Sequence, residues 1–574
     1  MKTEARFLLA ISLMLAVLVG TNQLFPPPAV EDAGVVADSA GPVTTAPLGL
    51  PDDVAGSTPA TGAQPTAAVD QGFAQDGEQT PQVAALVDVV VEGPRYRYRF
   101  TTLGARLTSG ELLEFGAINR GGPVQVVPDG ATPYLGSKVV VGQDTVDLSG
   151  VAFTVEPEEG LRLNSGDGPQ TLTFAYDHPT SDFTFRVEYA FDPDAYTVGV
   201  SGSLGGVDRA LLVTDLGEGL AYAEADSALE QRSMAYVYNH LQDGIRSTLL
   251  EKADAEVVEG PLIWAALRSK FFVTAVLSGS ADEVVDDTEY LGGLLVRPGE
   301  LPERVRIGAA RTVSEGETYS YRLFVGPQQY ALLSSLGDDM QEVNPYGWRF
   351  FRPIIRPFVS IIMTVLTFLH TQFSMGYGWV LIVFGVMMRV VLFPLNHKAM
   401  KAQLRNMAVQ PLVKQIQDKY KDKPEKLQKE MMKLYKDHGF NPLAGCLPML
   451  LPWPVLIALF FVFQNTIELR GVPFLWLPDL SAKDPFYILP VVLAISMFLM
   501  QWISLRSIDT DNPQMKMMMY IMPPMMLFIF MNLASGLNLY YATANIATLP
   551  QQIWIARERA RMKQGPPLTL TVSD

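Results

Sequence analysis

The sequence predicts a polytopic α-helical membrane protein that carries an all-β domain outside the membrane. Three observations predict this fold class. An apolar run follows two basic residues near the N-terminus, polar and apolar residues alternate from about residue 88 to residue 330, and several long apolar segments follow residue 345. The predicted architecture is an N-terminal anchor, an antiparallel β-sandwich and a five-helix core.

Charge is divided unevenly along the chain. Residues 24–345 contain 19 Lys and Arg against 47 Asp and Glu, whereas residues 346–574 contain 23 against 12. The isoelectric point near 4.9 therefore describes neither half. A strongly acidic region has no electrostatic reason to bind nucleic acid.

The residue inventory excludes several kinds of catalytic site. Cys446 is the only cysteine, so no intrachain disulfide can form, and the five histidines show no HExxH pattern. No Gly-Lys dipeptide occurs, which excludes a P-loop. We expect no catalytic residues, no metal, no cofactor and no small-molecule substrate, so the chain is predicted not to be an enzyme.

Residues 1–25 contain the run FLLAISLMLAVLVG after Lys2 and Arg6, which predicts a signal anchor whose start stays cytoplasmic. A cleaved signal peptide is the alternative. Residues 26–87 are rich in Pro, Ala, Gly and Asp and are predicted to form a disordered linker, because they cannot bury enough apolar area to offset their ordering entropy.

Residues 88–330 are predicted to form a β-sandwich. RYRYRF, QTLTFAYDH, DFTFRVEYAF, AYTVGVSG and TYSYRLFV alternate polar and apolar residues, and Gly, Asp and Pro turns separate such segments. The many carboxylates also fit a glycosidase, in which paired acids act as acid and base. An acidic, solvated surface is the interpretation that we favour, because no pair stands out by its context.

Residues 331–375 are predicted to form a connector and an amphipathic helix lying in the membrane interface. Arg349, Arg352 and Arg356 share one helical face, and an apolar helix with a cationic stripe at one end favours the interface. The block 396–440 holds 11 basic residues against 5 acidic ones and should be cytoplasmic. Only an odd number of crossings reaches it from an exported domain, which supports the interfacial helix.

Residues 376–555 are predicted to form the five-span core. The candidate spans are 376–395, 445–466, 486–505, 515–531 and 535–555. The block 396–440 would form a cytoplasmic helical hairpin, and the roughly neutral loop 467–485 would be periplasmic. Residues 26–345 would then lie in the periplasm of a bacterium, with the core in its inner membrane and residues 556–574 as a cytoplasmic tail.

Arg389 lies within the apolar run WVLIVFGVMMRVVLFPL. An arginine at such a depth costs about 3 kcal/mol on insertion scales. It could snorkel to the headgroups, which lie roughly 9 Å away at 1.5 Å per residue. It could instead face a water-filled cavity, where it would attract acidic residues of a passing chain. The residues alone leave both interpretations open.

Other polar side chains also occur at membrane depth, where they usually face neighbouring helices. Together with Arg389 they make a hydrated groove the preferred hypothesis. The candidate groove residues are Arg389, Gln464, Asn465, Gln501, Asn538, Tyr540, Tyr541 and Asn545.

The hairpin carries most of its basic residues on two predicted amphipathic helices. It is either a solvated charged loop or a docking arm for anionic headgroups or ribosomal RNA. The candidate docking residues are Lys398, Lys401, Arg405, Lys414, Lys419, Lys429 and Lys433.

Several stretches of the C-terminal half resemble one family, in order along the chain. They are FPLNHKAMKAQ shortly after Arg389, QPLVKQIQDKY, EMMKLYKDHGFNPLAGCLPMLL, FYILPVVLAISMFLMQ and SGLNLYYATANIATLPQQ. With them the chain resembles the YidC-type membrane protein insertases of the Oxa-type superfamily. The acidic β region, with a looser match, resembles the periplasmic domain of the Gram-negative form.

The resemblance implies five spans around a hydrophilic groove, with Arg389 as its arginine and Tyr540 and Tyr541 as its tyrosine pair. It implies a chaperone and insertase that inserts integral inner-membrane proteins, alone or with the Sec translocon. The implied partners are nascent inner-membrane proteins, the Sec translocon and membrane lipids, with the ribosome and the signal recognition particle pathway as further candidates. Gly385 departs from relatives that carry a polar residue there.

Two other classes of function remain as alternatives. A secondary transporter or an anion channel could also use an intramembrane arginine, although the sequence shows no repeated halves. A membrane-anchored carbohydrate enzyme would place the activity in residues 88–330.

Overall fold

The computed structural model describes residues 87–279, 290–299, 304–344, 346–347, 351–394, 453–506 and 513–563, with isolated positions between 397 and 430. The predicted anchor, the predicted linker up to residue 86 and the chain end beyond residue 563 lie outside the described residues. Most of the predicted hairpin 396–440 also lies outside them.

The acidic region forms strands, as the alternation of polar and apolar residues predicts. Each of the five alternating segments identified in the sequence contains one of them. The described strands are β1 (Asp88–Glu92), β2 (Tyr96–Thr101), β3 (Arg106–Gly116), β4 (Pro123–Gln125), β5 (Ser137–Val141), β6 (Asp144–Asp147), β7 (Thr154–Glu156), β8 (Leu161–Arg162), β9 (Gln170–Asp177), β10 (Thr184–Phe191), β11 (Thr197–Gly205), β12 (Arg209–Gly217), β13 (Ala235–His240), β14 (Gly244–Leu249), β15 (Glu256–Arg268), β16 (Phe272–Ser278), β17 (Leu291–Pro298), β18 (Val305–Ser314) and β19 (Thr318–Pro327).

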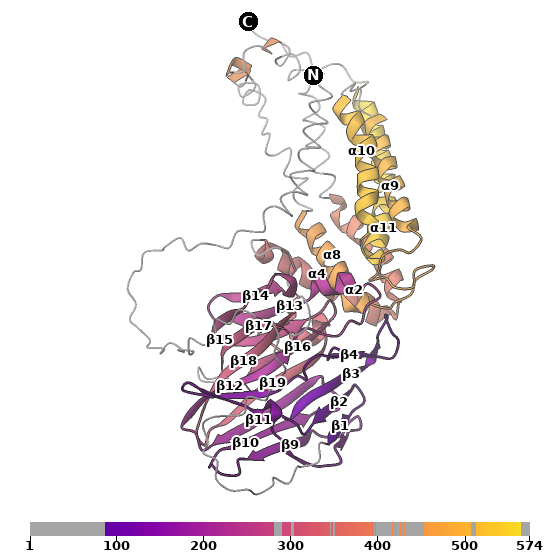
Figure 1. Ribbon diagram of the computed structural model, residues 1–574. Helices are drawn as coiled ribbons and strands as arrows, with labels where there is room; N and C mark the ends of the chain where they lie inside the picture. Colours follow the sequence, from indigo (N-terminus) through magenta and orange to yellow (C-terminus); the bar gives the residue numbers. More distant parts are fainter. Residues whose placement is uncertain are drawn as a thin grey trace, which may run out of the picture. The chain divides into compact units, whose positions relative to one another are not determined.

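These strands form two sheets. The smaller sheet has the order β4-β3-β2-β1-β8. The larger one runs β6-β5-β12-β18-β17-β15-β16-β19-β11-β10-β9-β7, and the β13–β14 hairpin joins it at β15. The paired strands are antiparallel apart from the short β1–β8 pair. Figure 1 shows β1 to β4 beside β9, β10 and β11.

Aromatic side chains fill the space between the two sheets. Tyr98 and Phe100 of β2 face Tyr189 and Phe191 of β10, and Phe174 of β9 completes the group. The ring centroids of Phe100 and Tyr189 are 5.2 Å apart, and those of Tyr98 and Phe191 are 6.1 Å apart. All five side chains are buried. Large aromatic rings dominate the area that a core removes from water, so this cluster joins the sheets into one domain.

Helices make up most of the described part of the basic half. Its described helices are α4 (Arg352–Phe373), the unlabelled helix Tyr377–Pro394, α8 (Trp453–Asn465), α9 (Ile488–Arg506), α10 (Pro513–Phe530) and α11 (Ser535–Lys563). The acidic half contains the short helices α2 (Ser227–Ser233) and α3 (Tyr330–Ser335). The 3-10 turns are η2 (Leu148–Gly150), η3 (Leu250–Lys252), η4 (Met340–Val343) and η5 (Ile467–Leu469). Arg352–Phe373 and Tyr377–Pro394 are the two described helices that are long and apolar enough to cross a membrane. The predicted count of five spans stays a prediction.

Helix α4 differs from the predicted interfacial helix in the partners of its arginines. The sequence placed these arginines on a stripe facing the membrane interface. In the structure the Arg356 guanidinium pairs with Asp339 at 2.9 Å and with Glu342 at 2.7 Å, and Arg352 donates to the Ile245 carbonyl at 3.4 Å. Protein acceptors therefore bind both side chains. Arg349 lies outside the described residues.

The aromatic cluster should contribute strongly to the stability of the β domain. Replacing Phe100 with Ala removes a buried ring that touches both β9 and β10, and such truncations cost about 3–5 kcal/mol. We expect Phe100→Ala to lower the urea concentration at which the β domain is half unfolded. Limited proteolysis of the purified full chain at increasing urea concentration measures this midpoint. Val257→Ala, at a half-exposed position, should change the free energy of unfolding by less than about 0.5 kcal/mol. Equal midpoints for the two variants would contradict the assigned packing.

Candidate functional site

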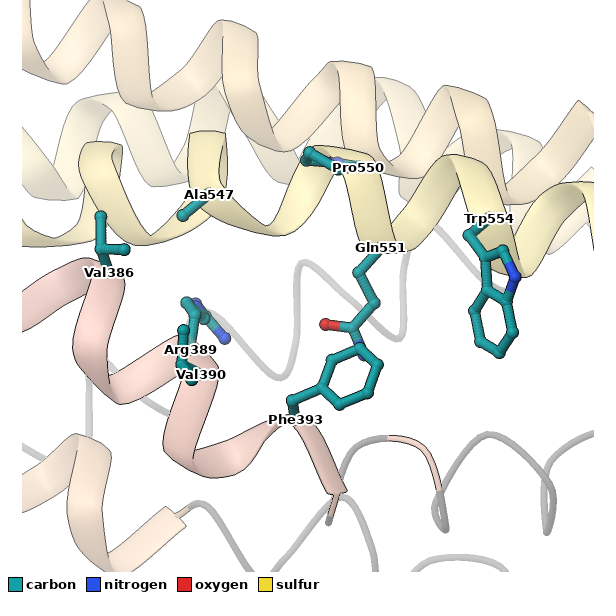
Figure 2. A pocket seen from close by; sticks show the side chains of 8 residues that line it. All are labelled: Val386, Arg389, Val390, Phe393, Ala547, Pro550, Gln551 and Trp554. Carbon is teal, nitrogen blue, oxygen red and sulfur yellow. The ribbon is translucent and has the colours of Figure 1, made fainter.

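A pocket of about 590 Å³ lies between the helix Tyr377–Pro394 and α11. Figure 2 shows that each helix contributes four of the side chains around it. They are Val386, Arg389, Val390 and Phe393 from the first helix and Ala547, Pro550, Gln551 and Trp554 from α11. Val386, Val390, Phe393 and Trp554 are between 43% and 67% exposed, so the apolar wall is open to its surroundings.

Arg389 is a cation on this apolar wall. Its Nε donates to the carbonyl oxygen of Ala544 on α11 at 3.0 Å. That carbonyl also accepts the Thr548 hydroxyl at 2.7 Å. Among the residues that the structure describes, no carboxylate lies within ion-pair distance of Arg389. Within the described residues, one hydrogen bond thus orients a guanidinium that carries five N–H donors, and no neighbouring carboxylate neutralises its charge.

The two helices approach closely beside the arginine. A Cβ built on Gly385 would lie 3.4 Å from Thr543 Cγ2 and 3.5 Å from the Tyr540 carbonyl oxygen. The ring of Phe384 lies 5.7 Å from the ring of Tyr540. A glycine lets the helix backbones come together, which brings Arg389 within reach of the Ala544 carbonyl.

The predicted tyrosine pair lies near this site. The Tyr540 and Tyr541 rings are 5.3 Å apart. They precede Ala544, the acceptor of Arg389, by about one helical turn. The structure therefore places the tyrosine pair on α11 close in sequence to the acceptor of Arg389, and its part in a groove stays a prediction.

The predicted groove residues Asn538 and Asn545 form hydrogen bonds outside the Arg389 pocket. Asn545 donates to the Ser496 hydroxyl at 3.2 Å and so links α11 to α9. Asn538 donates to the Phe530 carbonyl at 3.0 Å, at the end of α10. Neither residue lines the Arg389 pocket. Both instead join neighbouring helices, which is a common use of polar side chains in apolar surroundings.

The predicted glutamine positions are also separate from the pocket. Gln501 contacts the Met522 sulfur at 3.4 Å, between α9 and α10. Gln464 and Asn465 are half-buried at the end of α8. The groove formed by all eight predicted residues stays a prediction, since the described pocket contains Arg389 alone among them.

Sequence reasoning missed most of the residues that line the pocket. Ala547, Pro550, Gln551 and Trp554 recur at intervals of three and four, and so share one face of α11. That spacing was visible in the sequence. Its partner face could not be identified, because nothing local says which helix α11 packs against.

The predicted docking residues of the hairpin are mostly undescribed. Lys419 and Lys429 are the described members, and both are exposed. The Lys419 ammonium lies 5.7 Å from the Tyr420 ring centroid. The other predicted docking residues, Lys398, Lys401, Arg405, Lys414 and Lys433, lie outside the described residues.

Comparison with known proteins identifies relatives of both halves. A family model described as the 60Kd inner membrane protein matches residues 368–563, and one described as the YidC periplasmic domain matches residues 88–361. "Membrane protein insertase YidC" of Chlorobaculum parvum is 30% identical over 543 residues, covering 88% of this chain and 87% of that protein. The protein of the same name from Geotalea uraniireducens is 28% identical and covers 96% of this chain and 99% of its own length.

A solved structure is also similar in part. It is described as an active YidC insertase with the first transmembrane domain resolved, and it is 18% identical to this chain. The match covers 81% of this chain and 92% of that one, with a TM-score of 0.32. A score of this size establishes no common arrangement of the whole chain.

The close approach of the helix Tyr377–Pro394 to α11 at Gly385 should limit the size of the side chain at this position. Gly385→Ala should be tolerated, because the added Cβ meets its neighbours at ordinary contact distance. Gly385→Leu should force the helix away from α11, cost about 1–3 kcal/mol and weaken the Arg389–Ala544 hydrogen bond. Thermal unfolding of the purified chain in detergent measures both effects. A leucine variant as stable as the alanine variant would show that the two helices do not pack here.

Proposed function

The chain belongs to the YidC family of membrane protein insertases, and on this premise we propose that client proteins engage it through the Arg389 pocket. It is an inner-membrane insertase with a periplasmic β domain. One observation carries the proposal. Arg389 stands on the open apolar wall between two helices, and within the described part of the chain it has one hydrogen-bond acceptor and no carboxylate to neutralise it.

Electrostatics supports a transient role for Arg389. An arginine in an apolar environment costs about 3 kcal/mol, and an approaching carboxylate offsets part of that cost. Two unit charges 4 Å apart attract with about 4 kcal/mol at an effective dielectric constant of 20. The pair is worth less where water reaches it, about 1 kcal/mol or below when fully exposed. An acidic residue of a client would therefore be attracted and later released.

The apolar wall supports binding of the client's hydrophobic segment. Val390, Phe393 and Trp554 are exposed beside Arg389. Burial of a methylene group contributes about 0.8 kcal/mol without a directional requirement. Such a surface accepts varied apolar sequences, and the client's segment would leave it for lipid, where the same burial is available. In this proposal, binding and release of the client require no covalent chemistry.

The membrane arrangement is part of the proposal. The spans are the helix Tyr377–Pro394 and the segments 445–466, 486–505, 515–531 and 535–555, with the hairpin 396–440 in the cytoplasm. The exposure of Lys419 and Lys429 supports a hairpin that meets anionic lipid or ribosomal RNA. We propose the Sec translocon, the ribosome and the signal recognition particle pathway as further partners.

Replacement of Arg389 tests the electrostatic step. Arg389→Ala should reduce insertion of a single-span reporter with an acidic exported segment by about tenfold, since tenfold corresponds to about 1.4 kcal/mol. Arg389→Lys should be milder because it keeps the charge. A reporter with a neutral exported segment should insert normally in both variants. Insertion is measured in cells depleted of the wild-type chain, with Val383→Ala as the control, because Val383 is exposed on the same helix but does not line the pocket. Equal insertion of the acidic reporter by Arg389→Ala and Val383→Ala would refute the step.

Water access to position 389 is a separate test. In a Cys446→Ser background, Arg389→Cys should react with a membrane-impermeant maleimide added to inverted membrane vesicles, which expose the cytoplasmic side. Leu381→Cys on the same helix is the control, because Leu381 is fully buried. If the Arg389→Cys variant is as unreactive as the Leu381→Cys variant, position 389 is not reached from the cytoplasm and the proposed route is wrong.

A further inference from the structure

The segment between α8 and α9 packs against the β domain. Its 3-10 turn η5 contributes to two cores at once. Ile467 belongs to the hydrophobic cluster of the β domain, and Leu469 belongs to the cluster of the helices. Both side chains are at most 3% exposed. One short turn therefore joins the two halves of the molecule.

Arg470, next to this turn, binds the β domain through three contacts. Its Nε pairs with the Glu224 carboxylate at 2.6 Å, and its Nη2 donates to the Ala223 carbonyl at 3.4 Å. The guanidinium also lies 5.1 Å from the Phe272 ring centroid. The Arg470 and Glu224 side chains are 5% and 9% exposed. The pair is thus buried, and the arginine both hydrogen-bonds and stacks.

The acceptors of Arg470 are held in place from within the β domain. Glu230 of α2 is buried, and its carboxylate accepts the backbone N–H groups of Ala223 and Glu224 at 2.9 Å each. Burial raises the pKa of Glu230 to about 7. Burial also raises the pKa of Glu224, although Arg470 opposes the shift. These shifts fit a contact from which water is withheld.

Two further contacts surround Arg470. Lys270 of the β domain donates to the Ser481 carbonyl at 3.4 Å, and burial lowers the pKa of this lysine. At the exposed edge the Lys483 ammonium lies 4.0 Å from the Asp226 carboxylate. The contact therefore has an apolar centre, a buried ion pair and a solvated rim, which is the arrangement of a specific protein interface.

We propose that Arg470 is a latch that holds the periplasmic β domain in one fixed position on the segment 466–487. The docked domain then braces the connection between α8 and α9. A buried ion pair is costly to break, because removing one partner leaves the other charge buried alone. The covalent link between the two halves keeps the effective concentration high, so a small interface is sufficient for stable docking. The latch does not depend on the Arg389 pocket.

Cross-linking of the full chain tests docking directly. In a Cys446→Ser background, Ser227→Cys and Lys483→Cys lie on the two sides of the solvated rim, next to Asp226 and at Lys483 itself. A short bismaleimide should link them in native membranes. Arg470→Glu should lower the yield at least fivefold, because it sets two carboxylates against each other. Absence of a cross-link in the otherwise unchanged chain would overturn the proposal, as would an unchanged yield with Arg470→Glu.

Charge exchange distinguishes a latch from a general loss of structure. The double variant Arg470→Glu with Glu224→Arg should recover at least half of the cross-link, since the pair is restored in reverse. Arg120→Ala removes an exposed ion pair with Asp129 and should leave the yield unchanged. If the β domain of Arg470→Glu is digested by protease, Glu224→Gln is used instead. Hydrogen exchange in residues 466–487 should then rise severalfold, and an unchanged exchange rate would overturn the proposal.

Discussion

The cost of removing an arginine from water constrains both halves of this molecule. Arg470 is almost completely buried, and its charge is matched by Glu224, a carbonyl and an aromatic ring. Arg389 is only half-buried and has a single described hydrogen-bond acceptor, on α11. A buried charge without a partner strongly destabilises the fold, whereas a half-buried charge is partly solvated and is tolerated without an ion-pair partner. The same type of side chain makes a fixed contact at position 470, and the proposed function gives it a transient one at position 389.

The uneven distribution of charge along the chain fits this difference between the two arginines. Carboxylates of the acidic half supply the partners for Arg470, Arg356 and Lys483. Among the described residues, none of these carboxylates is near Arg389. A carboxylate beside Arg389 would neutralise it permanently and compete with those of a client. Keeping the pocket free of acids preserves the attraction that the proposed function requires.

Much of the fold could be predicted from sequence, because its signals are local. Alternation predicted the strands, and Asn532–Gly536 separated two apolar segments that the structure ends at Phe530 and begins at Ser535. Arg389 could be singled out because a charge within an apolar run is conspicuous. The sheet order was not predictable, since it depends on pairings between distant strands. Trp554 was missed for the same reason: its role depends on which helix faces α11.

The predicted polar groove shows a further limit of sequence reasoning. A buried asparagine must find a partner, but the sequence does not say whether the partner is a client, water or a neighbouring helix. Asn545 binds Ser496 and Asn538 binds the end of α10, so both are used in holding helices together. Arg470 was predicted only as part of the roughly neutral loop 467–485. Its pairing with Glu224 was not predictable, because the two residues lie far apart in the sequence.

In the proposed function, client recognition depends on one oriented cation and an apolar wall. This simplicity suits an insertase, because its clients share hydrophobicity and little else. Directional hydrogen bonds from several amides would favour particular sequences, since each unmatched polar group adds a desolvation cost. Apolar contact and a long-range charge impose no such requirement. A pocket made from these two elements can therefore bind many different segments weakly, and weak binding is what allows each of them to leave.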